Sequence, residues 1–137
     1  MKNHPSWLAA GLLVFVVLAC STSTSTGPIS DIHMAKDNGK EEPADTTTTF
    51  SPGDRTIHCV IKLKEAKEGT KVNFAWWSVD TPGSKNEKVK DFDYTTKAEE
   101  NIVHGHLTLP RDWPKGKYKC EVTVNGSAGN SINYTVE

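Results

Sequence analysis

The chain has few cysteines, few aromatic residues and no long apolar run. It contains 3 cysteines in 137 residues, and aromatic side chains make up 8%. Its main apolar run, Leu8 to Leu18, is shorter than the ~20 residues that a membrane-spanning helix needs. The sequence has no Cys-X-X-Cys pair, no glycine-rich phosphate loop and no glycine-flanked serine elbow. We therefore expect no enzyme and no cofactor.

The charge is nearly balanced, with 16 Lys and Arg residues against 17 Asp and Glu residues. A balanced chain has no general attraction for a polyanion, so we expect no nucleic-acid partner. Hydrophobic residues make up 36% of the chain, and part of that share lies in the apolar N-terminal run. The remainder supports only a small core, and small exported domains of that kind often depend on a disulfide.

The N-terminus is typical of an export signal. Lys2 and His4 precede the apolar run, which ends in Val17-Leu18-Ala19-Cys20. This ending resembles the lipobox of bacterial lipoproteins, and the resemblance implies that residues 1–19 are a signal peptide and that Cys20 is acylated. The alternatives are an ordinary cleavage site or an uncleaved anchor. In all three cases the domain is exported. If Cys20 is acylated, lipid also holds the domain on a membrane.

The resemblance also predicts where the protein is held. Ser21 follows Cys20, and a residue other than aspartate there resembles the sorting pattern for the outer membrane. We therefore expect a lipid-anchored protein of the bacterial cell envelope, in the outer rather than the inner membrane. Residues 20–48 are polar and acidic without a sustained hydrophobic period, so we expect a flexible linker there.

Residues 49–137 are predicted to form one all-β domain. Short runs with a period of two are separated by turn signals, such as Asn125-Gly126, every 8–12 residues or so. About seven such strands indicate an antiparallel β-sandwich. The expected strands are 46–50, 55–64, 71–79, 89–94, 102–109, 118–124 and 131–136.

Four residues indicate which class of β-sandwich this is. Tyr118 and Cys120 share one face of a late strand, and Cys59 and Trp76 lie on alternating strands upstream. The set resembles the immunoglobulin-like superfamily. The resemblance implies a disulfide between Cys59 and Cys120, which are also the pair left over if Cys20 is acylated. It also implies that the Tyr118 hydroxyl bonds to the backbone at a corner, where we expect Trp113 to plug the end of the core.

Three histidines form the strongest candidate for a functional site. His104 and His106 fall on the same side of one strand, and the apolar residues of that strand fall on the other. In immunoglobulin-like topology the strand of His58 pairs with this strand. We expect all three imidazoles on one exposed face, where they could bind Zn²⁺ or Cu²⁺. The alternative is a set of solvated histidines with no ligand.

A second candidate is an apolar surface around Trp77. If Trp76 points inward, Trp77 points outward, and Val79, Phe92 and Tyr94 could complete a patch that binds a protein or a glycan. The alternative is that another part of the chain covers Trp77. The leading interpretation is a membrane-anchored, non-catalytic binding or structural module. The alternative function is a periplasmic metal-binding protein that uses the histidines.

Overall fold

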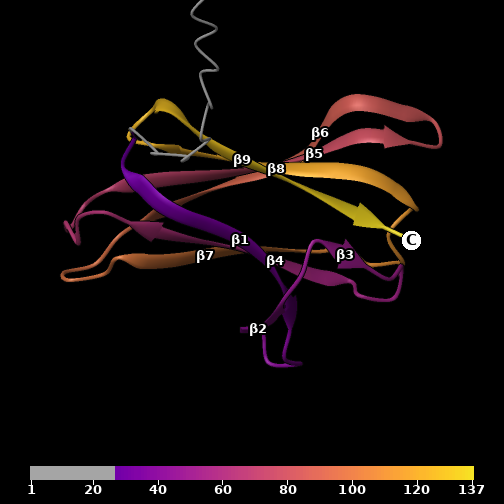
Figure 1. Ribbon diagram of the computed structural model, residues 1–137, viewed down its shortest axis with the longest axis horizontal. Helices are drawn as coiled ribbons and strands as arrows, with labels where there is room; N and C mark the ends of the chain where they lie inside the picture. Colours follow the sequence, from indigo (N-terminus) through magenta and orange to yellow (C-terminus); the bar gives the residue numbers. More distant parts are fainter. Residues whose placement is uncertain (1–26) are drawn as a thin grey trace, which may run out of the picture.

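The computed structural model describes residues 27–137, which form two β-sheets packed face to face (Figure 1). The predicted signal peptide, 1–19, and the predicted lipidation site, Cys20, lie outside the described residues. The strands are β1 (Ile29–Asp37), β2 (Pro43–Thr46), β3 (Thr49–Phe50), β4 (Thr56–Leu63), β5 (Lys71–Thr81), β6 (Ser84–Thr95), β7 (Ile102–Thr108), β8 (Gly116–Val124) and β9 (Ser127–Val136). Residues 27–137 include no helix with the length and apolarity needed to cross a bilayer.

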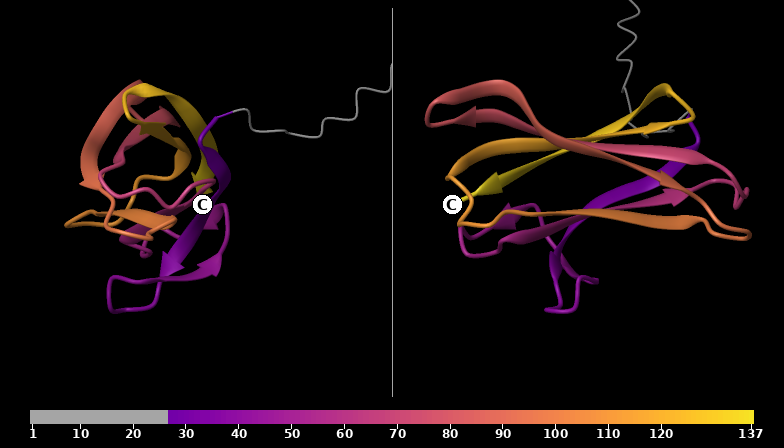
Figure 2. Two further views of the ribbon diagram at one scale, coloured as in Figure 1. Left: turned by 90° about the vertical axis from the view of Figure 1, so that its left-hand side faces the viewer. Right: turned by 180° about the vertical axis from the view of Figure 1, so that it is seen from behind.

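The strand order confirms the predicted sandwich. One sheet has the order β2-β1-β4-β7, and the other has the order β3-β9-β8-β5-β6. The two layers are separate when the molecule is seen end-on (Figure 2). Every pairing is antiparallel except that of β3 with β9, which is parallel. The described domain therefore has nine strands, two more than the sequence indicated.

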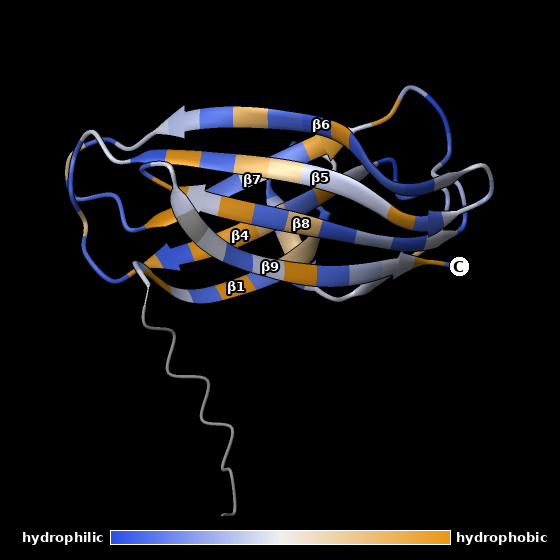
Figure 3. Cartoon of the chain, turned by 90° about the horizontal axis from the view of Figure 1, so that it is seen from above, coloured by the Kyte–Doolittle hydropathy of each residue, from blue (hydrophilic) through white to orange (hydrophobic). Residues whose placement is uncertain are grey.

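The core forms because alternate residues of each strand point between the sheets. Along β8, Tyr118, Cys120, Val122 and Val124 are buried, while the residues between them are partly exposed. Figure 3 shows the corresponding alternation of apolar and polar segments. Each fully buried aliphatic or aromatic side chain stabilises the fold by about 1.5–3 kcal/mol relative to an exposed one. Trp76 is fully buried and belongs to the same cluster as both core cysteines.

The corner before β8 is built as predicted. The Tyr118 hydroxyl donates a hydrogen bond of 2.5 Å to the carbonyl oxygen of Pro114. Trp113 is 2% exposed, donates from Nε1 to the carbonyl of Arg55 at 2.9 Å, and packs edge-on against Tyr118. Because its indole has both a polar partner and aromatic neighbours, Trp113 closes the end of the core.

The prediction of a flexible linker over residues 20–48 is wrong for its described part. β1 pairs along its length with β4, and β2 pairs with β1, so the folded domain includes residues well before position 49. Ile29 and Met34 are fully buried in the core. The segment has a polar composition because only one face of β1 is apolar. The strand that pairs with β1, β4, lies about 25 residues further along the chain, so no local pattern reveals the pairing. Long-range backbone hydrogen bonds therefore outweigh the polar composition.

The predicted disulfide is not formed in the structure, where Cys59 and Cys120 are buried free thiols. They come from facing sheets, since β4 and β8 belong to different layers. Burial raises the pKa of the Cys120 thiol well above its usual value, and the neighbouring Cys59 raises it further. The predicted neighbourhood of the two cysteines is thus present, without a bond between their sulfur atoms.

Candidate metal centre

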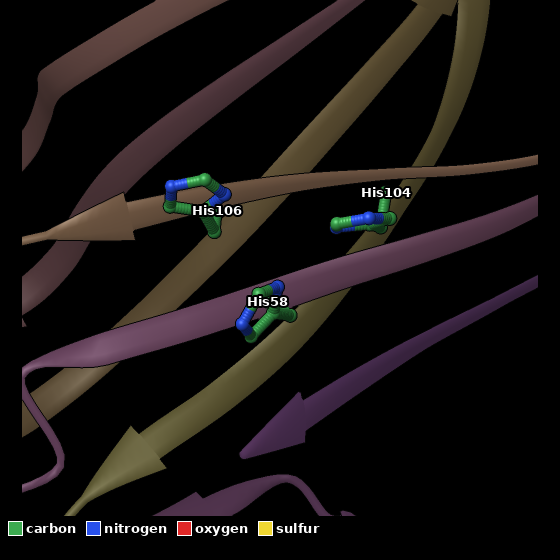
Figure 4. Close-up of side chains that lie close together, drawn as sticks. All are labelled: His58, His104 and His106. Atoms are coloured by element: carbon green, nitrogen blue, oxygen red, sulfur yellow. The ribbon is translucent and has the colours of Figure 1, made fainter. Parts of the chain in front are cut away.

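Two neighbouring strands bring the three predicted histidines together. β4 pairs antiparallel with β7 in a register that places His58 opposite His106 and Val60 opposite His104. Since alternate residues of a strand share a face, His104 lies diagonally across from His58 on the same side of the sheet. Figure 4 shows the three rings gathered on that side of the two strands. The predicted pairing of these strands is confirmed.

The three rings are close enough to share one ion. One ring nitrogen from each of His58, His104 and His106 lies within 4.8 Å of the other two. The ring centroid of His58 is 5.4 Å from that of His104 and 5.3 Å from that of His106. Nitrogens bound to a tetrahedral Zn²⁺ at 2.0–2.1 Å stand about 3.3 Å apart. The nitrogens would have to move closer to reach that spacing, and the exposed His104 ring is the freest of the three to rotate.

The prediction that His58 faces solvent is wrong, since His58 is fully buried. It points out of the sandwich, as the alternation required, but the hairpin of β1 and β2 extends past this face of the sheet (Figures 1 and 2). His58 Nε2 donates a hydrogen bond of 2.7 Å to Asp37 Oδ1 at the end of β1. The segment taken for a linker therefore supplies both the cover and the bonding partner of His58.

The Asp37 contact fixes which nitrogen of His58 can bind a metal. With Nε2 protonated and bonded to a carboxylate, Nδ1 carries the lone pair of the neutral ring. Nδ1 is buried and has no hydrogen-bond partner among residues 27–137. A carboxylate bonded to the far nitrogen is the usual means by which proteins orient a metal-binding histidine. Buried polar atoms without partners are uncommon, and a bound cation would satisfy this one.

The electrostatics of the cluster favour neutral imidazole. Desolvation lowers the pKa of His104, and the nearby rings of His58 and His106 lower it further, against opposing effects of Glu100 and Glu42. Desolvation alone would raise the pKa of Asp37, but hydrogen bonds from His58 and from the backbone N–H groups of Gly39 and Glu41 hold it below its usual value. Asp37 is thus a carboxylate and His104 a neutral base near pH 7. These are the protonation states that metal binding requires.

The glycine between the two β7 histidines has a structural reason. A side-chain carbon at Gly105 would lie 2.7 Å from the ring of Phe74, which is closer than real contacts allow. Gly105 therefore lets the middle of β7 lie directly on the core, while His104 and His106 point the other way.

Two polar residues at this face were missed because they lie in the segment taken for a linker. Asp37 is one. The other is His33. It lies on β1 opposite Val60 of β4 and therefore shares a face with the three candidate ligands. His33 bonds through Nδ1 to Asp31 Oδ2 at 3.0 Å and is not part of the cluster. Only a strand assignment for residues 29–37 could have placed them here.

The predicted apolar patch is wrong, because its four residues do not share a surface. Phe92 and Tyr94 lie opposite Phe74 and Val72, and they pack against the core from the inner side of β6. Trp77 lies on the other face of this sheet, half-buried with the ammonium groups of Lys88 and Lys119 at 5.7 and 5.4 Å from its ring centroid. Val79 is half-buried further along β5. Simple alternation puts Phe92 and Tyr94 on the inner side of the sheet, because they lie directly opposite the buried Phe74 and Val72.

Solved structures show what kind of domain this is. An immunoglobulin-like protein from Pseudomonas aeruginosa aligns with a TM-score of 0.53 at 12% identity, over 78% of this chain and 92% of that chain. The chain therefore has an immunoglobulin-like β-sandwich fold, which is compatible with a non-catalytic module. No family model and no curated protein sequence matches the chain.

Partial likenesses to two larger enzymes have lower scores. A Pseudomonas fluorescens alkylpurine DNA glycosylase has a TM-score of 0.44 at 17% identity, and the alignment covers 77% of this chain and 30% of that one. A Listeria innocua β-glucosidase has a TM-score of 0.47 at 14% identity, with 78% of this chain and 16% of that one covered. In each case the alignment covers less than a third of the enzyme.

Proposed function

We propose that the protein is a lipid-anchored module of the bacterial cell envelope that binds a divalent transition-metal ion, Zn²⁺ or Cu²⁺, through His58, His104 and His106. The observation that supports this best is the buried Nδ1 of His58. In the described part of the chain this nitrogen has no hydrogen-bond partner, and its residue is clustered with two other imidazoles. Imidazole nitrogen suits both ions. The immunoglobulin-like scaffold would supply a rigid frame, since two of the ligands come from one strand and the third from its neighbour.

Metal titration of the purified full-length protein tests this function. We expect saturable binding of one Zn²⁺ or Cu²⁺ per chain by calorimetry. Replacing the exposed ligand, His104→Ala, removes one of three donors without disturbing the core, and we expect affinity to fall by at least about 100-fold. Asp37→Asn keeps all three ligands but weakens the orientation of His58, so we expect a loss of about 10–100-fold.

His33→Ala is the matched control, because His33 lies on the same face but outside the cluster. We expect its metal affinity to equal that of the wild type. If the wild type bound no tighter than a dissociation constant of about 10 μM, a binding free energy of about −7 kcal/mol, the proposed function would be wrong. Equal losses in His33→Ala and His104→Ala would point to non-specific binding.

Lipid anchoring through Cys20 is tested separately. Acyl chains contribute about 0.8 kcal/mol for each buried methylene, so an acylated Cys20 would hold the protein in the membrane fraction through high-salt washes. We expect Cys20→Ser to abolish the mass increase from acylation and to release the protein from that fraction. A Cys20→Ser protein that stayed with the membranes would require a different anchor.

A further inference from the structure

The candidate metal centre has three protein ligands. Within the described residues, the group contains His58, His104 and His106 and no carboxylate or thiol. Asp37, the carboxylate bonded to the cluster, contacts the far nitrogen of His58. Structural zinc sites use four protein ligands, whereas catalytic sites use three and leave the fourth position to water or substrate. Three histidines around Zn²⁺ therefore leave a position for water.

That position is accessible from solvent. His104 is exposed and His106 is half-buried, so the ring of His58 forms the closed side of the site. A cavity of about 430 Å³ lies beside His104 and His106. Its lining also includes Glu41 and Thr108, which are polar, and Phe92, which is apolar. A small molecule in this cavity thus lies beside the two outer ligands.

We propose that the zinc-loaded protein hydrolyses small carboxylic esters at this site. The inference rests on the proposed metal function and adds an activity to it. From the sequence we expect no enzyme, because no set of side chains supplies a nucleophile and its base. A zinc ion would supply the missing nucleophile. It lowers the pKa of its bound water to about 7 and so provides hydroxide near neutral pH.

The reaction balances without any further reactant. The zinc-bound hydroxide oxygen forms a bond to the ester carbonyl carbon, and the carbon–oxygen bond to the alcohol breaks. The departing alkoxide takes up the proton that the hydroxide carried into the new carboxyl group, so the products leave as an alcohol and a carboxylate. A second water then binds zinc and releases a proton to solvent. The sum is ester plus water giving acid plus alcohol, with no change of oxidation state.

Hydrolysis of p-nitrophenyl acetate tests the activity directly. The full-length protein is stripped with a chelator, reloaded with one equivalent of Zn²⁺, and compared with the stripped protein and with free Zn²⁺ at equal concentration. We expect the loaded protein to be faster than both by at least about tenfold, since metal catalysis supplies several kcal/mol and each 1.36 kcal/mol is tenfold in rate. His104→Ala should lose this gain, and His33→Ala should keep it.

A second measurement reports the open position itself. With Co²⁺ in place of Zn²⁺, addition of azide should change the visible absorption spectrum, because the anion replaces the bound water. If one Zn²⁺ stays bound per chain through gel filtration but the hydrolysis rate equals that of the stripped protein, the hydrolytic inference is overturned and the metal site stands. An unchanged Co²⁺ spectrum with azide would likewise overturn it. Failure to retain zinc at all would overturn the proposed function instead.

Discussion

Trp76→Ala is expected to destabilise the domain by about 3–5 kcal/mol, whereas Trp77→Ala is expected to cost only about 1–2 kcal/mol. The two tryptophans are neighbours in β5 but lie on opposite faces of the sheet. Trp76 is fully buried between the sheets, edge-on to Tyr134 with ring centroids 6.3 Å apart, so its removal leaves a large cavity. Trp77 is half-buried beneath two lysines and loses mainly surface contacts.

Urea unfolding of the two variants measures the difference. Domains of this size have a total stability of about 5–15 kcal/mol, so Trp76→Ala removes a large share of it. Trp76→Phe is the matched control, because it retains an apolar aromatic ring and should recover part of the loss. Equal midpoints for Trp76→Ala and Trp77→Ala would mean that the assignment of their faces is wrong.

The sequence predicted the inner face of the sandwich better than its outer faces. The period-two pattern of β8 identified Tyr118, Cys120 and Val122 as buried, because that pattern directly reports which side chains leave water. It also required His58 to point away from the core. It did not predict that His58 would be buried there, since that depends on a hairpin from another part of the chain.

The candidate site was predicted in part for the same reason. His104 and His106 are two residues apart on one strand, so their shared face follows from strand geometry alone. Their proximity to His58 followed from the topology that the resemblance implied. Asp37 could not be found in this way, because it lies in a segment whose polar composition is typical of a linker. Its role depends on pairing between β1 and β4, which no local pattern reports.

Oxidation of Cys59 and Cys120 to a disulfide is expected to raise the stability of the domain by about 4 kcal/mol, because the bond would close a loop of about 60 residues in the unfolded chain. The two buried thiols come from facing sheets. The raised pKa of Cys120 means that little thiolate, the reactive form, exists in the folded state. We therefore expect the disulfide to form during folding, and the folded reduced protein to resist oxidation and alkylation.

Intact mass under non-reducing conditions and urea unfolding with and without reductant measure both parts of this prediction. Protein refolded under oxidising conditions should be two hydrogens lighter than the reduced form and should unfold at a higher urea concentration. The double variant Cys59→Ala, Cys120→Ala should show no response to reductant, which separates the effect of the disulfide from that of the reagent. Free thiols at both positions after oxidative refolding would contradict the disulfide. Alkylation of the folded reduced protein at the rate of an exposed cysteine would contradict the inferred protection, since both sulfur atoms lie within the core.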